Sequence, residues 1–230
     1  MTVAANQPYL FPYLGYFQLI AGADLFVIAD SLQFTKETWM IRNKLLIQGH
    51  PKLVTSSVID KKHIAPINCK YYRDNLLSNW LNYLKFDYAN APYTENVIDL
   101  ITETLKNGER NVAIVNELLI KAICNFIGVE TPMLRLSELR VKSDEKVKRV
   151  IEITKLCGGD SFINLPGGRT LYDKNIFARE GIELQFLEPS LPPYRQQRTR
   201  EFHPGLSILD LLCNISPSEI LDMVKSARFS

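Results

Sequence analysis

The sequence lacks any clustering of cysteine and histidine. Its 230 residues include only 4 cysteines and 3 histidines. The cysteines, Cys69, Cys124, Cys157 and Cys213, stand far apart and form no CxxC or CxxH spacing. This distribution excludes a zinc site of the usual kind and a redox pair. Three of the cysteines lie in apolar runs, so we expect buried, reduced thiols and no metal site.

The chain also lacks long apolar runs and a large net charge. No apolar run approaches the roughly 18 residues that a membrane span needs. A signal peptide has a basic segment before an apolar stretch, and the start of this chain, MTVAANQPY, has no such segment. We therefore expect a cytoplasmic protein without a membrane span. The formal net charge of +2 is too small to favour nucleic acid as a partner, so anion recognition would depend on particular Arg and Lys residues.

What is present indicates a globular α/β domain. Hydrophobic residues make up 46% and charged residues 23% of the chain, as in ordinary globular proteins. Apolar runs predict strands over 2–5, 25–29, 132–136, 160–164 and 182–187. Helical periodicity predicts helices over 14–22, 143–157 and 173–179, and near 207–213 and 217–227. This alternation predicts a Rossmann-like parallel sheet of about five strands, because parallel strands need crossover helices between them.

The middle of the chain has a different pattern. Two extended runs around a Gly-containing turn predict a hairpin over 44–59. Further helices are predicted over 72–86, 93–106 and 111–127. We interpret 44–128 as a hairpin and helical subdomain inserted into a single domain that spans 1–230.

The first candidate for a ligand site is the loop between the first predicted strand and helix. It carries Asn6, Gln7 and Tyr9 together with two prolines, which stiffen the loop and hold its polar groups. The helix that begins near Leu14 offers free N–H groups and a positive dipole end to an anion. The alternative is an ordinary turn whose aromatic rings fill the core.

A second polar loop follows the second predicted strand. Asp30 stands at the end of that strand, where its carboxylate could orient a hydroxyl, act as a base or cap the turn. Gln33 follows, and Lys36 and Arg42, next to Asn43, could hold a phosphate. For Lys36 the alternative is a solvated basic surface.

A third loop carries Gly167 and Gly168 after a predicted strand, followed by Tyr172. Paired glycines let a backbone approach a ligand closely, although the pattern is neither GxGxxG nor a P-loop. The basic segment 194–204, which begins at Tyr194, could be a lid or a plain surface loop. Open parallel sheets bind ligands at the carboxyl ends of their strands, so we expect the three loops to meet there.

Several segments of the chain resemble the WbqC-like protein family, nearly end to end and in the right order. The most specific is VAANQPYLFPYLGYF, and the other matching blocks are 24–43, 91–93, 167–172 and 194–210. The family pattern has histidine where this chain has Asn6, and Asp-Asp where it has Asp30 and Ser31. Asparagine keeps a hydrogen-bond donor but cannot transfer a proton at neutral pH.

A fainter likeness concerns the nucleotide-binding turn of nucleotidyltransferases. The order strand, QPxxxPxxGYFxxI and apolar strand is similar to that of the HIGH-type nucleotidyltransferases, in which this turn grips phosphates. Gly15 matches the glycine of the Gly-His pair in the HIGH-type nucleotidyltransferases, and Tyr16 stands where those enzymes have histidine.

The WbqC-like resemblance implies an accessory enzyme of O-antigen, lipopolysaccharide and related surface-glycan pathways. We therefore expect a transferase that modifies a nucleotide-linked or amino sugar, with Asp30 and Asn6 as catalytic candidates. The candidates for substrate binding are Gln7, Tyr9, Gln33, Lys36, Arg42, Asn43, Gly167, Gly168, Tyr172 and Tyr194. The alternatives are nucleotidyl or adenylyl transfer assisted by Mg²⁺, and a non-catalytic binding protein that uses the same pocket.

Overall fold

The structure is a computed structural model that describes residues 1–35, 38–60 and 64–230. Its strands are β1 (Thr2–Asn6), β2 (Leu25–Ile28), β3 (Arg42–Ile47), β4 (His50–Thr55), β5 (Met133–Arg135), β6 (Ser161–Asn164), β7 (Glu183–Glu188) and β8 (Arg228–Phe229). Its helices are α1 (Leu14–Ala21), α2 (Ser78–Asp87), α3 (Thr94–Thr104), α4 (Val112–Ile127), α5 (Lys146–Leu156), α6 (Lys174–Arg179), α7 (Ile208–Asn214) and α8 (Pro217–Lys225). Short 3₁₀ helices are η1 (Ile67–Cys69), η2 (Leu136–Glu138) and η3 (Pro166–Gly168). None of the helices in these ranges is long and apolar enough to span a membrane.

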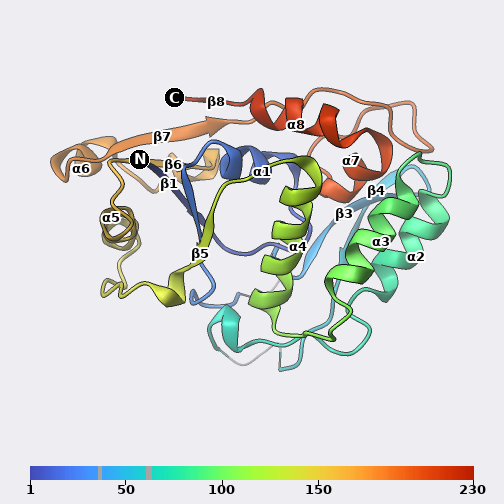
Figure 1. The fold of residues 1–230 in the computed structure, drawn as a ribbon, viewed down its shortest axis with the longest axis horizontal. Helices are drawn as coiled ribbons and strands as arrows, with labels where there is room; N and C mark the ends of the chain where they lie inside the picture. The colour runs from blue at the N-terminus through green and yellow to red at the C-terminus, as the bar shows by residue number, and fades with distance from the viewer. Residues whose placement is uncertain (36–37, 61–63) are drawn as a thin grey trace.

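Six strands form the central sheet in the order β5-β2-β1-β6-β7-β8 (Figure 1). The first five pair in parallel, and β8 joins β7 antiparallel. The α/β class with a mostly parallel sheet is therefore confirmed, but the sheet has six strands rather than about five. β8 was not predicted, because a strand of two residues is too short to show a periodic pattern. It is recognised as a strand only by its pairing with Leu187 and Glu188 of β7.

Helices cover both faces of the sheet, as alternating strand residues require. Val3 faces the side on which α5 and α6 pack, whereas Ala4 faces the side of α1, α4 and α8. The second side also carries the hairpin of β3 and β4 and the helices α2 and α3 (Figure 1). One continuous apolar core joins these elements to α1; in it the Phe11 and Trp80 ring centroids lie 5.0 Å apart.

The hairpin turns through Gln48 and Gly49, whose φ angles are 54° and 78°. Two positive φ angles are typical of a type I′ turn, whose twist matches that of the paired strands. Gly49 is also required by packing, because a Cβ there would collide with the carbonyl oxygen of Arg198.

The helix predicted over 72–86 begins later than expected, at Ser78. The Tyr72 N–H donates to the Arg110 carbonyl at 2.8 Å, and the Arg73 N–H donates to the Ser57 carbonyl at 2.9 Å. These hydrogen bonds pair the start of the predicted helix with other segments of the same polypeptide. The predicted helix was therefore wrong at its N-terminal end. Helical periodicity could not reveal the competing partners.

Candidate functional site

Loops from three strands leave the same edge of the sheet. β1 pairs in parallel with β2 on one side and with β6 on the other, so their carboxyl ends lie together. The chain runs outward from β1 to β2 and β5, and then crosses to β6 and β7 on the opposite side. The boundary between β1 and β6 is therefore a switch in strand order, where open α/β sheets bind their ligands.

A pocket of about 460 Å³ opens at this switch, a size suited to a small molecule. Three segments supply most of its wall, through Tyr9, Tyr13, Trp39, Asn43, Leu165 and Gly167. The structure thus brings together Tyr9, Asn43 and Gly167, one predicted residue from each of the three loops. We call this cavity the switch pocket.

Aromatic rings dominate the wall of the switch pocket. Trp39 leaves 42% of its surface exposed, although it is large and apolar. Burial raises the pKa of Tyr9 and of Tyr13 above the usual value of a phenol, so both hydroxyls stay protonated and can donate hydrogen bonds. The described wall includes no carboxylate. It can bind and orient a ligand, but it offers neither a general base nor the carboxylate oxygens that hold Mg²⁺.

The loop after β1 is held in an unusual shape by bonds to its backbone. Phe11 has a φ of 46°, which residues other than glycine rarely adopt. Its carbonyl accepts hydrogen bonds from Asn43 Nδ2 at 2.7 Å and from Ser207 Oγ at 2.9 Å. Asn43, predicted to bind substrate, therefore uses its amide to fix the loop that forms the pocket.

The N-terminus of α1 borders the switch pocket. Tyr13 occupies the N-cap position, and no side chain caps the helix among the described residues. Gly15 makes room for the Tyr13 ring, which a Cβ at that position would approach to 2.5 Å. An uncapped helix N-terminus leaves backbone N–H groups available for an anion.

Asn6 and Gln7 lie at the end of β1, outside the wall of the switch pocket. Asn6 Oδ1 accepts the Gln7 N–H at 2.8 Å, and the Gln7 carbonyl accepts the Tyr16 hydroxyl at 2.9 Å. These bonds fix the start of the loop. They leave Asn6 Nδ2 and the Gln7 side-chain amide without a partner among the described residues.

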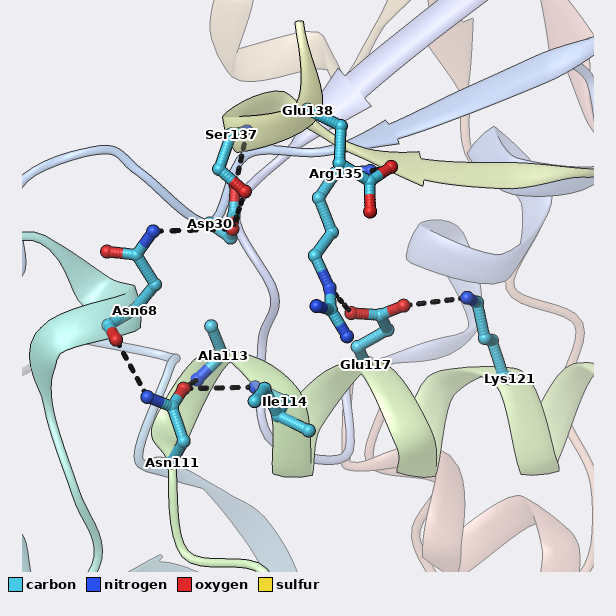
Figure 2. A network of polar contacts seen from close by, with 10 residues as sticks. All are labelled: Asp30, Asn68, Asn111, Ala113, Ile114, Glu117, Lys121, Arg135, Ser137 and Glu138. Carbon is cyan, nitrogen blue, oxygen red and sulfur yellow. Dashed lines mark hydrogen bonds and ion pairs between the residues drawn. The ribbon is translucent and has the colours of Figure 1, made fainter.

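Asp30 is buried away from the switch pocket, with 2% of its surface exposed. One carboxylate oxygen accepts the Ser137 N–H at 2.9 Å, and the other accepts the Ser137 hydroxyl at 2.6 Å (Figure 2). The second oxygen also accepts Asn68 Nδ2 at 3.4 Å. The carboxylate therefore ties the end of β2 to η2 and η1, and it orients the hydroxyl of Ser137.

The predicted phosphate-binding residues of the second loop are spread around this edge. The Arg42 guanidinium lies 6.0 Å from the centre of the Trp39 ring, and its Nε is buried without a partner among the described residues. Gln33 is exposed and lines a separate hollow. Lys36 lies outside the described residues.

Of the residues predicted after β6, only Gly167 reaches the switch pocket. Gly168 is packed against Asn164, whose Nδ2 a Cβ at Gly168 would approach to 2.6 Å. Tyr172 packs edge-on against Phe177, with ring centroids 5.8 Å apart. The need for glycine at position 168 is thus explained by close packing within the protein.

A buried carboxylate holds the segment 194–204. Asp210 is fully buried and accepts the Tyr88 hydroxyl at 2.7 Å, Gln196 Nε2 at 3.1 Å and the Tyr194 hydroxyl. We call these four residues the latch. They fasten the segment, predicted to be either a lid or a surface loop, to α7.

The latch predicts a pH dependence of stability. Burial raises the pKa of Asp210 above its ordinary value near 4, and hydrogen bonds from Tyr194 and Tyr88 only partly oppose this shift. The folded state therefore binds the proton more tightly than the unfolded state. The resulting stabilisation is full below about pH 4 and is lost as the pH rises through the folded pKa.

We expect Asp210→Asn to remove this titration. Urea unfolding of both proteins between about pH 4 and pH 8 measures the difference in their free energies of unfolding. That difference should move in favour of the variant as the pH rises. A difference independent of pH would contradict the shifted pKa.

Sequence reasoning missed an ion-pair network between α4 and β5. Glu117, only 5% exposed, pairs with Arg135 and with Lys121 Nζ, the latter at 2.6 Å (Figure 2). The i, i+4 spacing of Glu117 and Lys121 was a visible signal. The ion pair between Glu117 and Arg135 depends on how β5 packs against α4, so no sequence pattern could predict it.

The cysteines offer no reactive thiolate in the core. All four are free, and burial raises the pKa of Cys124 and of Cys213 to about 12. Of the three cysteines in apolar runs, Cys124 and Cys213 are buried as expected, whereas Cys157 is only half-buried. Cys69, which lies outside those runs, is exposed. In the described part of the chain, no three His, Cys, Asp or Glu side chains gather where they could hold a metal ion.

Comparison with known proteins identifies a family and a relative that each match most of the chain. The pattern of the WbqC-like protein family matches residues 7–221. The uncharacterized protein Rv1507c of Mycobacterium tuberculosis (strain ATCC 25618 / H37Rv) is 26% identical over 233 residues, which cover 98% of each chain. No solved structure matches. The chain belongs to the WbqC-like protein family.

Proposed function

We propose that this protein is a transferase that modifies a nucleotide-linked or amino sugar in the biosynthesis of a bacterial surface glycan. The observation that carries the proposal is the switch pocket, an aromatic cavity bordered by the uncapped N-terminus of α1. Membership of the WbqC-like family supports the surface-glycan context, which the resemblance of the sequence already implied.

The order of the strands supports a nucleotide as part of the ligand. Counted within the sheet alone, the order is 3-2-1-4-5-6, as in Rossmann-like sheets that bind nucleotides at the switch. The last strand departs from that pattern because it runs antiparallel.

Each part of a sugar nucleotide has a matching feature in or beside the switch pocket. The exposed Trp39 ring offers a stacking surface for a base or a sugar, and the Tyr9 hydroxyl offers a donor. The N-terminus of α1 would receive the phosphates, with the Arg42 guanidinium beside Trp39 as a further cation. The backbone at Gly167 lies open, since a Cβ there would meet nothing within 4 Å.

The predicted catalytic residues take different parts in this proposal. Asp30 takes no part at the switch pocket, because its carboxylate holds the Ser137 hydroxyl and neither residue lines that pocket. The side-chain amides of Asn6 and Gln7 remain available to a substrate. Asparagine at position 6 can hold a hydroxyl or a carbonyl but cannot transfer its proton.

Two alternatives make different predictions. Nucleotidyl transfer would need Mg²⁺ near the phosphates, and the described wall of the switch pocket does not fit this ion because it contains no carboxylate. A non-catalytic binding protein would bind the same sugar nucleotide without turning it over.

The first test is a thermal-shift panel of nucleotide sugars, free sugars and nucleotides, with and without Mg²⁺. A ligand at 100 times its Kd adds about 2.7 kcal/mol, which raises Tm by roughly 5–10 °C for a chain of this size. We expect a shift with one class of nucleotide sugar. No shift with any member of the panel would overturn the proposal.

Trp39→Ala tests the location of the site. Stacking of a base on an aromatic ring contributes about 1–3 kcal/mol, so titration calorimetry should show a Kd roughly 5- to 150-fold weaker. Phe86→Ala is the matched control, because Phe86 is 71% exposed on α2 and lies outside the wall of the pocket. Equal effects of the two substitutions would place the ligand elsewhere.

A further inference from the structure

A second hollow, of about 360 Å³, lies at the carboxyl ends of β2 and β5. It shares no described wall residue with the switch pocket. Ser31 and Gln33 border it after β2, Ser137 borders it after β5, and Asp144 and Arg149 border it from the start of α5. We call it the α5 hollow.

The Arg149 guanidinium is fixed in place within the α5 hollow. Its Nε donates to the Ser143 carbonyl at 3.2 Å, and its Nη2 donates to the Asp144 carbonyl. Its Nη1 has no partner among the described residues. A guanidinium held by two backbone carbonyls keeps its charge and presents its remaining N–H groups without loss of side-chain freedom on binding.

An opposite charge borders the same hollow. The Asp144 carboxylate forms no ion pair or hydrogen bond within the described part of the chain, and it does not pair with Arg149 although both line the cavity. The hydroxyls of Ser31 and Ser143 and the side-chain amide of Gln33 also have no described partner. A ligand that carries both charges could therefore engage both residues.

The rest of the wall is apolar. Leu32, Leu136, Leu139 and Val141 contribute to the α5 hollow, so one part of a ligand would be packed against hydrocarbon. This wall distinguishes the hollow from a site for a fully hydrated ion such as inorganic phosphate.

We propose that the α5 hollow binds a free α-amino acid. Its carboxylate would pair with Arg149 in a forked arrangement, its ammonium would pair with Asp144, and its side chain would lie against Leu139 and Val141. The inference goes beyond the sugar-nucleotide function and does not depend on it, because the two cavities share no described wall residue.

The test begins with titration calorimetry of the full chain against each of the twenty L-amino acids. At least one, with an apolar or small side chain, should bind with a Kd below about 1 mM. Its carboxyl amide and its N-acetyl derivative should each bind at least tenfold more weakly, because each loses one of the two charges. Failure of all twenty to bind, or equal binding of the blocked derivatives, would overturn the proposal.

Two variants locate the site. Asp144→Asn and Arg149→Gln should each weaken binding at least tenfold, and Arg179→Gln, an exposed arginine on α6, should not. Arg149 also holds the chain before α5, whereas the Asp144 side chain holds nothing that the structure describes. Asp144→Asn therefore keeps the test decisive if Arg149→Gln does not fold.

The switch pocket provides an independent control. Trp39→Ala should leave amino-acid binding unchanged while it weakens binding of the nucleotide sugar. Loss of amino-acid binding in Trp39→Ala would place the amino acid in the switch pocket and overturn the assignment to the α5 hollow.

Discussion

Replacement of Asn116 by alanine should destabilise the protein by about 3 kcal/mol, because it removes three buried hydrogen bonds and leaves the Pro8 carbonyl without a donor among the described residues. Asn116 is fully buried on α4. Its Nδ2 donates to the carbonyls of Pro8 at 2.9 Å and Met40 at 2.7 Å, and its Oδ1 accepts the Tyr72 hydroxyl at 2.9 Å. One side chain thus joins the loop after β1 to the segment before the hairpin.

Urea unfolding with linear extrapolation measures the loss. Asn125→Ala is the matched control, because Asn125 lies on the same helix, is exposed and forms no side-chain hydrogen bond among the described residues. It should change the free energy of unfolding by no more than about 0.5 kcal/mol. A similar loss in both variants would contradict the role of the buried network, because alanine favours a helix more than asparagine does.

Replacement of Asp210 by alanine should have a comparable effect and should also release the segment 194–204. The substitution removes the common acceptor of Tyr88, Tyr194 and Gln196. An unpaired buried donor costs about 1–3 kcal/mol. Water can reach part of the released segment and satisfy some of the donors, so we expect the free energy of unfolding to fall by about 3 kcal/mol.

Two measurements separate the global effect from the local one. Urea unfolding gives the loss of stability, and limited proteolysis should show faster cleavage at Arg195, Arg198 or Arg200 under native conditions. The control is Asp222→Ala, since Asp222 is exposed on α8 and its side chain forms no described hydrogen bond. Unchanged cleavage in Asp210→Ala would show that other contacts suffice to hold the segment.

Hydrophobic periodicity predicted most of the fold because most elements bury one consistent face. The strands near 25–29 and 182–187 and the helix near 111–127 appear within two residues of the predicted bounds. The helix predicted from residue 72 was wrong at its start, because the N–H groups of Tyr72 and Arg73 donate to carbonyls of residues far away in the sequence. β8 was missed for a related reason: its pairing with β7 depends on tertiary contacts.

The sequence predicted that the three polar loops meet, but it did not predict which contacts their side chains form. The predicted parallel sheet and the polarity of its loops placed the three loops at one edge, and Tyr9, Asn43 and Gly167 line one pocket there. The sequence could not show that Asp30 faces Ser137, because that contact depends on where β5 lies beside β2. Exposed Trp39 could not be recognised either, since its exposure is a property of the packed surface.

The shape of the loop after β1 has a consequence for the kinetics of binding. Its backbone is fastened at Pro8, Phe11 and Pro12 by groups from α4, the hairpin and the segment before α7. The loss of chain entropy that orders the loop therefore occurs once, during folding, and need not recur at each encounter with a ligand. Association at the switch pocket can then proceed by direct docking, without waiting for a rare conformation of this loop.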